Sequence, residues 1–243
     1  MKYFNYFPNV EYLYGDEKAL TIGNNLSIYA EVVDTIADNA AFYLDYTIQE
    51  FERPDQVSFK LYKTPNYHWT FFLLNPKLRG SGWPLSNRDL LSKAQVDYGK
   101  KVITTKTVLT DKFKVGQTIQ GNTSAAEATV DHRHLDFGQL VLTSVSGEFE
   151  AGEVATSTNS NGDIESINIA SYVDEYEAVH HYENASGEYV DIDPTVGAGS
   201  LLTPITYLDR LISENDQVKN IRVIKPNAID DIVSAFREAV RSG

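Results

Sequence analysis

The feature that most constrains the fold of this 243-residue chain is a change of sequence pattern along its length. Before residue 102, apolar residues recur mainly at helical spacing. From Val102 to Ile169, alternation replaces that spacing, and Thr, Val, Gly and Ser dominate. Helical spacing returns near the end of the chain. Because helical and strand patterns occupy separate stretches, the sequence predicts an α+β fold.

The first part predicts a compact strand–helix–helix unit. Ala41–Phe51 alternates apolar and polar residues as a strand does. Pro54 suits the first helical position, and Asp55 suits the positive end of the helix dipole. Thr64–Asn75 begins with a cap and a proline and predicts a second helix. A turn is expected at Gly80–Gly82, before a third helix from about Ser86.

The middle part predicts a small β-domain. Five short strands separated by Gly and Asn turns are expected at 107–111, 113–121, 127–133, 138–145 and 147–157. The pattern F-x-x-G-(Q/E) occurs twice, beginning at Phe113 and at Phe149, 36 residues apart. Two such copies suit two related corners of one small barrel or sandwich.

The last part is acidic and aromatic from Ser171 and ends in clearer elements. Ile221–Ile224 predicts a short strand, and Asn227 is expected to cap a helix. That helix would carry one apolar face, formed by Ile229, Ile232, Val233, Phe236 and Val240.

The net charge of −13 comes from one segment. His134 to Leu208 contains 13 Asp or Glu residues and no Lys or Arg, and the remaining 34 − 13 = 21 acids balance the 21 bases. Such a chain repels phosphates, so neither nucleic acid nor an anionic membrane surface is expected as a partner. We expect the acidic segment to be solvated or to face a basic partner.

Cysteine is absent, which excludes a disulfide framework, a thiolate zinc site and a cysteine nucleophile. The longest strongly apolar run, Trp69–Leu74, is far shorter than the roughly 20 residues that span a bilayer. The N-terminal residues lack the apolar core of a signal peptide. We therefore expect a soluble protein that is made and used without secretion.

No catalytic chemistry is predicted. His132, His134 and Asp136 alternate along one strand, as metal ligands or as the polar face of a hairpin would. We favour the second interpretation and expect no metal. His180 and His181 are adjacent and point to opposite faces. Nucleophile-elbow, phosphate-loop and dinucleotide motifs are absent, so neither a cofactor nor enzymatic activity is expected.

The aromatic residues favour a role in assembly. Trp69 is expected in a core, whereas Trp83 suits either a core or an exposed anchor. The 15 Tyr and 11 Phe residues exceed what one small core needs, and aromatic side chains are enriched at protein interfaces.

Four ordered segments resemble a known family. RPDQVSFKLYKTPNYHWTFFLLN, at Arg53–Asn75, followed by Trp83, is similar to the core of a baseplate wedge subunit of T4-like contractile-tailed phages, the gene product fifty-three family. YFPNVEY, HHYENASGEYVD and the C-terminal strand and helix resemble further elements of that family. The matching positions proposed to define the module or its interactions are Arg53, Pro54, Asp55, Tyr62, Trp69, Asn75 and Trp83. Lys63 departs from the pattern, because the family usually has glycine there.

The resemblance implies an N-terminal interaction arm at 1–40 and a LysM-like module at 41–98. An inserted β-domain would occupy 99–170, and an acidic linker, short strand and C-terminal helix would follow at 171–243. The protein would be a structural virion component of the tail baseplate, assembled in the host cytoplasm. It would join adjacent wedges into a six-fold ring, with other wedge subunits and the sheath-initiator subunit as partners.

A second function stays open at this stage. True LysM domains bind N-acetylglucosamine chains, and the corresponding groove here would be lined by Glu52, Arg53, Pro54, Asn75 and Pro76. The chain would then be a glycan-binding module of a tail protein. A tail lysin would need a catalytic pair that the sequence does not show.

Overall fold

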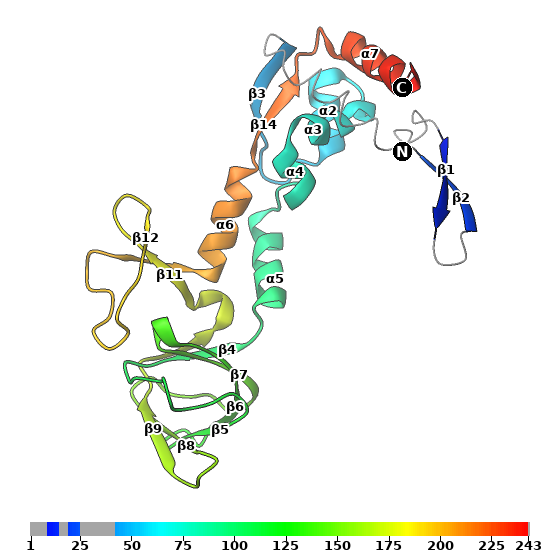
Figure 1. Ribbon diagram of the computed structural model, residues 1–243. Helices are drawn as coiled ribbons and strands as arrows, with labels where there is room; N and C mark the ends of the chain where they lie inside the picture. The colour runs from blue at the N-terminus through cyan, green and yellow to red at the C-terminus, as the bar shows by residue number, and fades with distance from the viewer. Residues whose placement is uncertain (1–8, 15–18, 25–41, 243) are drawn as a thin grey trace. The chain divides into compact units, whose positions relative to one another are not determined.

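The computed structural model describes residues 9–14, 19–24 and 42–242 and divides into two compact units (Figure 1). Unit 1 comprises Met1–Ser86 with Asn215–Gly243, and unit 2 comprises Asn87–Glu214. The described residues contain six α-helices and antiparallel sheets, of which the largest has seven strands. The predicted α+β class is therefore confirmed.

Unit 1 is built on a two-stranded antiparallel sheet whose strands come from distant parts of the chain. Strand β3 pairs with β14 in a register that joins Tyr43 to Ile224 and Thr47 to Asn220. Its elements are β1 (Asn9–Tyr14), β2 (Ala19–Asn24), β3 (Tyr43–Thr47), α2 (Pro54–Tyr62), α3 (Trp69–Leu74), α4 (Pro76–Ser81), β14 (Asn220–Ile224) and α7 (Ile229–Ser242). Figure 1 shows β3 and β14 side by side with α2 and α3 next to them.

The N-terminal segment is described only in part. Strands β1 and β2 form an antiparallel hairpin that pairs Asn9 with Asn24. The other residues of the predicted arm at 1–40 lie outside the described residues.

Local sequence explains how α2 begins and ends. Pro54 occupies the first turn, as predicted, and the side-chain oxygen of Gln56 accepts the N–H of Arg53 at 2.9 Å. Lys63 ends the helix in the left-handed conformation, with φ 59°, and donates its N–H to the carbonyl of Phe59. The position where the family usually has glycine is therefore one at which glycine is the least strained residue.

Two predictions for the helices of unit 1 need correction. The single helix expected at Thr64–Asn75 is a 3-10 turn at Pro65–Tyr67 followed by α3. The turn expected at Gly80–Gly82 is mostly helical, because Pro76 starts α4 and Gly82 closes it by donating its N–H to Leu78. Helix α7 begins at Ile229, two residues after the predicted cap.

Two adjoining groups of buried side chains form the core of unit 1. Helices α2 and α3 cover the sheet through Val57 and Phe71, which contact the same cluster as Ile221 and Val223. Helix α7 packs through Ile229, Val233 and Phe236, three members of its predicted apolar face. The side chain of Val240, the last member of that face, lies outside the described residues.

Unit 2 contains the seven-stranded sheet, with strand order β10-β4-β7-β6-β5-β8-β9. A three-stranded sheet follows in the order β12-β11-β13. The strands are β4 (Lys101–Thr104), β5 (Thr118–Gly121), β6 (Glu127–His134), β7 (Gln139–Ser146), β8 (Val154–Thr158), β9 (Ile164–Asn168), β10 (Ser171–Asp174), β11 (Val179–Glu183), β12 (Tyr189–Val190) and β13 (Thr203–Thr206). Helices α5 (Asn87–Asp97) and α6 (Tyr207–Gln217) flank this stretch of chain.

The seven-stranded sheet is open. Within the described residues its end strands, β10 and β9, pair with one neighbour each, so no closed barrel is found. Four of the five predicted strand regions contain a strand. The region 107–111 does not, because Leu109 turns into the core and accepts the N–H of Lys112 across a tight turn. The other three strands of this sheet, β4, β9 and β10, were not predicted.

The repeated F-x-x-G-(Q/E) pattern forms the same turn twice. Phe113 and Phe149 are both buried in the core of unit 2. Gly116 and Gly152 adopt φ angles of 87° and 91°, which favour glycine. Their N–H groups donate to the carbonyls of Val130 and Ile169 on a neighbouring segment. The N–H groups of Val130 and Ile169 donate in turn to the carbonyls of Gln117 and Glu153, the residues after the two glycines.

Candidate functional site

The sequence-predicted residues Arg53, Pro54 and Asp55 lie together at the start of α2. Arg53 is largely exposed, and its guanidinium lies 3.2 Å from the Asp55 carboxylate. An exposed ion pair of this kind contributes little to stability. The three residues therefore set the start of the helix and present one charged pair to solvent.

Tyr62 and Trp69 connect the helices to the C-terminal elements of unit 1. The Tyr62 hydroxyl donates to the carbonyl of Ile224 at 2.9 Å, and desolvation raises its pKa well above the ordinary tyrosine value. The Trp69 ring lies 4.9 Å from the ring of Phe236 on α7. Trp69 is therefore a packing residue, in agreement with the prediction.

Asn75 binds the backbone of β14 like an extra strand. Its Nδ2 donates to the carbonyls of Phe71 at 2.7 Å and Arg222 at 2.8 Å, and its Oδ1 accepts the Arg222 N–H at 2.9 Å. Arg222 lies opposite Asp45 in the ladder, and the Asn75 amide satisfies its outward-facing backbone groups. The amide thus covers the outer edge of β14 at this residue.

Trp83 is half-buried and packs in the core of unit 1. Its ring centroid lies 6.0 Å from the centroids of both Phe71 and Phe72. Its indole N–H donates to the carbonyl of Glu52 at 2.6 Å. Of the two interpretations left open by the sequence, the geometry agrees with the core one.

Glu52 anchors a polar cluster at the loop between β3 and α2. Its carboxylate accepts the Tyr46 hydroxyl at 2.8 Å, the Lys60 ammonium at 2.9 Å and the Gln49 N–H at 2.9 Å. Hydrogen bonds with Tyr46 and Glu52 raise the pKa of Lys60 to about 12. The Glu52 carboxylate is therefore already held within the module.

A groove of about 230 Å³ lies beside Asn75 in unit 1. Its lining includes the apolar residues Leu74, Pro76 and Ile221 and the basic residues Lys77 and Arg222. The sequence-predicted glycan groove shares Asn75 and Pro76 with this hollow. Glu52, Arg53 and Pro54 are not part of its lining.

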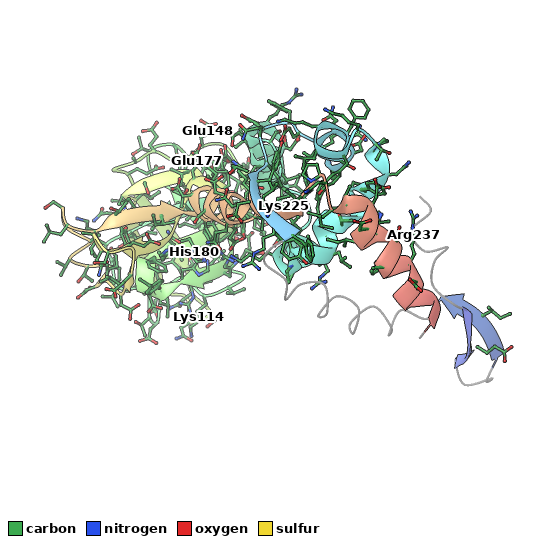
Figure 2. The ribbon with its side chains drawn as sticks, turned by 90° about the horizontal axis from the view of Figure 1, so that it is seen from above. Lys114, Glu148, Glu177, His180, Lys225 and Arg237 are labelled. Carbon is green, nitrogen blue, oxygen red and sulfur yellow. The ribbon has the colours of Figure 1, made fainter. Side chains whose placement is uncertain are left out.

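Unit 2 gathers four of the five histidines around Tyr207. The Tyr207 ring lies 4.9 Å from His180, and its hydroxyl lies 3.4 Å from Nε2 of His134. His132 contacts His134 edge to face, and His181 does the same with His180, which Figure 2 labels. Spacing along one strand could not predict this cluster, because its residues come from three elements: two histidines from β6, two from β11 and Tyr207 from α6.

Two of these histidines resist protonation. Desolvation, followed by the neighbouring Arg210 and His181, lowers the pKa of His180. Desolvation and His132 lower the pKa of His134, although Glu175 and Asp136 oppose that change. Arg210 donates to Nε2 of His180 at 3.0 Å, so the imidazole serves as an acceptor. The described residues include no group of three or more His, Asp or Glu side chains able to hold a metal ion.

The acidic segment includes carboxylates that hold the fold of unit 2. Glu153, only 6% exposed, accepts the N–H groups of Thr123 and Ser124, each at 3.0 Å. Glu165 is also buried and accepts the N–H of Phe113 at 2.7 Å. The expectation that the whole segment is solvated is therefore wrong for these residues, because backbone donors compensate their burial.

Comparison with known proteins gives no family assignment. The chain matches no protein-family model and none of the curated proteins. Across the described ranges, every helix is too short or too polar to cross a bilayer.

Proposed function

We propose that this chain is a structural virion protein of a contractile-tail baseplate, in which it joins adjacent wedges into the ring around the tail hub. The observation that carries the proposal is the order β3–α2–α3–β14 in unit 1, with β3 and β14 paired antiparallel. A two-stranded sheet covered by two helices is the architecture of a LysM-like module. That is the module implied by the sequence resemblance to the wedge-subunit family.

The chemistry of the resembling residues supports a structural role. Tyr62, Trp69, Asn75 and Trp83 all bond or pack inside unit 1. None of these contacts requires a substrate. They hold a rigid module that can present other surfaces to neighbouring subunits.

Exposed aromatic residues supply a surface for such neighbours. Phe51 is 71% exposed and adopts a positive φ of 66°, and Phe59 on α2 is 59% exposed. Large aromatic side chains are enriched where proteins meet. We assign these two residues to a contact with another wedge subunit.

Wedge reconstitution tests this function. Purified wedge subunits of the phage that encodes the chain would be mixed with the full chain, with Phe59→Ala or with a chain lacking Met1–Asn39. The full chain should close wedges into six-fold rings visible by electron microscopy. The deletion should block closure, and Phe59→Ala should weaken it. Rings that form equally well without the chain would refute the proposal.

Glycan binding by the LysM-like module is the second candidate function. The groove of about 230 Å³ beside Asn75 favours it. The internal hydrogen bonds of Asn75 and Glu52 weigh against it, because both side chains would have to exchange these partners for a sugar. A peptidoglycan pull-down that survives salt and is lost on changing Pro76 and Lys77 would favour this function over wedge joining.

A further inference from the structure

The two F-x-x-G-(Q/E) turns of unit 2 are related by a local two-fold axis. Strands β5 and β8 follow the two turns and pair antiparallel with each other. Gln120 lies opposite Thr156, which is its own counterpart 36 residues later. The pairs Ile119–Ser157 and Gly121–Ala155 exchange under the same rotation. Figure 2 shows Lys114, beside the first turn, and Glu148, beside the second, on opposite flanks of the unit.

In the second half of this pseudo-symmetric pair, a carboxylate closes the space between turn and hairpin. Glu153 accepts the N–H of Glu150 in its own turn at 2.6 Å. Its other oxygen accepts the N–H groups of Thr123 and Ser124, and its first oxygen also accepts the Ser124 hydroxyl at 2.8 Å. The hairpin between β5 and β6 is thereby held against the turn.

In the first half, a glutamine stands where the second half has Glu153. The Gln117 Oε1 accepts the N–H of Lys114, just as Glu153 accepts that of Glu150. The other end of the Gln117 amide is an NH2 group, which donates to the carbonyl of Thr158 at 3.3 Å and to the Glu165 carboxylate at 3.4 Å and cannot accept backbone N–H groups. Ser160 lies 36 residues after Ser124, in the turn between β8 and β9, and its N–H has no acceptor within the described part of the chain.

An open cavity lies beside the first turn. It has a volume of about 970 Å³, near the upper end of the roughly 300–1,000 Å³ typical of ligand pockets. Neutral hydroxyl and amide side chains dominate its lining, among them Gln117, Thr118, Gln120, Thr158, Ser160 and Asn161. Val115 and Ile164, 63% and 77% exposed, add two aliphatic side chains.

We propose that this cavity binds a neutral oligosaccharide. Sugar hydroxyls both donate and accept, as do the hydroxyl and amide groups that line the cavity. The carboxylates of Asp111 and Glu127 provide further acceptors for hydrogen bonds from sugar hydroxyls, and the aliphatic side chains provide contacts for the C–H face of a sugar ring.

The same lining disfavours other ligand classes. Asp111, Glu127 and Glu165 outnumber Lys114, so an anionic ligand would meet net repulsion. Strands β5 and β8 are interior strands paired on both sides, so an extended peptide could add to the sheet here only at the end strand β9, which contributes Ile164 and Glu165 to the lining. The proposal does not depend on the wedge-joining function of unit 1.

A glycan array probed with the full chain tests the proposal. It would carry neutral hexose chains, neutral N-acetylhexosamine chains, and sulfated and sialylated glycans. We expect binding to one of the neutral sets. Thr118→Arg should reduce that binding at least tenfold, because it places a long side chain in the cavity.

Two control variants make the outcome decisive. Val154→Arg changes the symmetry counterpart of Thr118 on the same sheet but outside the cavity lining, so it should bind like the unchanged chain. Asn75→Ala, in unit 1, should also bind normally, which separates this site from the LysM-like groove. The proposal would be overturned by no binding to neutral glycans, by binding confined to anionic glycans, or by neutral binding that a folded Thr118→Arg variant retains.

Discussion

At the scale of single residues, Lys63 shows how a departure from a family pattern can be explained by backbone geometry. It adopts φ 59° at the end of α2, where a side chain is strained and glycine is not. Among the described residues, the Lys63 ammonium makes one long contact, 3.4 Å to the carbonyl of Lys60. The side chain therefore offers little compensation for the strain.

Replacing Lys63 by glycine should consequently stabilise unit 1 by about 0.5–1 kcal/mol. Lys60→Gly is a comparison of opposite sign, since Lys60 has helical geometry inside α2, where glycine costs about 1 kcal/mol, and the variant also loses the bonds of Lys60 to Glu52 and Tyr46. Urea denaturation of both variants measures the two changes. Destabilisation by Lys63→Gly would contradict the assigned conformation.

Asn75 is a second residue whose role depends on backbone contacts. Asn75→Ala leaves the N–H and carbonyl of Arg222 without their protein partner. Because these groups are partly exposed to water, we expect a loss of about 1–2 kcal/mol in the free energy of unfolding. Asn66→Ala, at an exposed position of the same unit, should change it by less than about 0.5 kcal/mol. Equal losses for the two variants would refute the role of Asn75.

The histidine cluster predicts that unit 2 loses stability in mild acid. The folded pKa values of His134 and His180 lie below the ordinary value of 6.5. As the pH falls below about 6.5, the unfolded chain therefore takes up these protons before the folded chain does. The stability contributed by the neutral imidazoles is present above that pH and is lost as the pH falls through the lowered values.

Thermal melting between pH 7.5 and 5 measures this loss. The double variant His134→Gln with His180→Gln should show a weaker dependence of Tm on pH over that range. A dependence equal to that of the unchanged chain would contradict the role assigned to these two histidines.

At the scale of elements, the sequence predicted the helices and strands that local residue patterns specify. The proline at the start of α2, the alternation in β3 and the apolar spacing of α7 all appear in the structure. The pairing of β3 with β14 was not predictable, because Thr47 and Asn220 are 173 residues apart and a single sequence does not encode their register. The roles of Asn75 and Glu153 were missed for the same reason, since their partners are backbone groups on other elements.

Helix α7 is held by its buried face, which gives a prediction at this scale. Phe236 is fully buried and contacts Trp69, so Phe236→Ala should cost about 3–5 kcal/mol. Phe59→Ala, at a largely exposed position on α2, should cost less than about 0.5 kcal/mol. Urea denaturation measures the loss of stability in each variant. Hydrogen exchange of the folded variants then shows whether the α7 amides have lost protection. A small loss for Phe236→Ala would contradict the packing of α7 on the module.

At the scale of the whole molecule, the chain enters and leaves unit 2 at neighbouring points of unit 1. The Asn215 Oδ1 accepts the N–H of Leu85 at 2.8 Å, and its Nδ2 donates to the Leu85 carbonyl at 3.1 Å. These reciprocal bonds join the two chain segments of unit 1 at the point where the first ends, at Ser86, and the second begins, at Asn215. Unit 2 can therefore be regarded as an insertion between two adjacent residues of the smaller module.

Excising residues 87–214 and joining the ends with a short Gly-Ser linker should leave unit 1 folded. We expect one cooperative unfolding transition and retained protection of the β3 and β14 amides in hydrogen exchange. A linker variant that also carries Asn215→Ala should be less stable, because it lacks the bonds to Leu85. An excised chain without protected β3 amides would show that unit 1 needs unit 2 to fold.

The most direct test of the proposed wedge-joining function is an electron cryomicroscopy map of an assembled contractile-tail baseplate that contains this chain. We expect copies of unit 1 at the boundaries between adjacent wedges, repeated with six-fold symmetry, with α2 facing a neighbouring subunit. A baseplate ring that is complete without this chain, or one in which unit 1 touches a single wedge only, would contradict it.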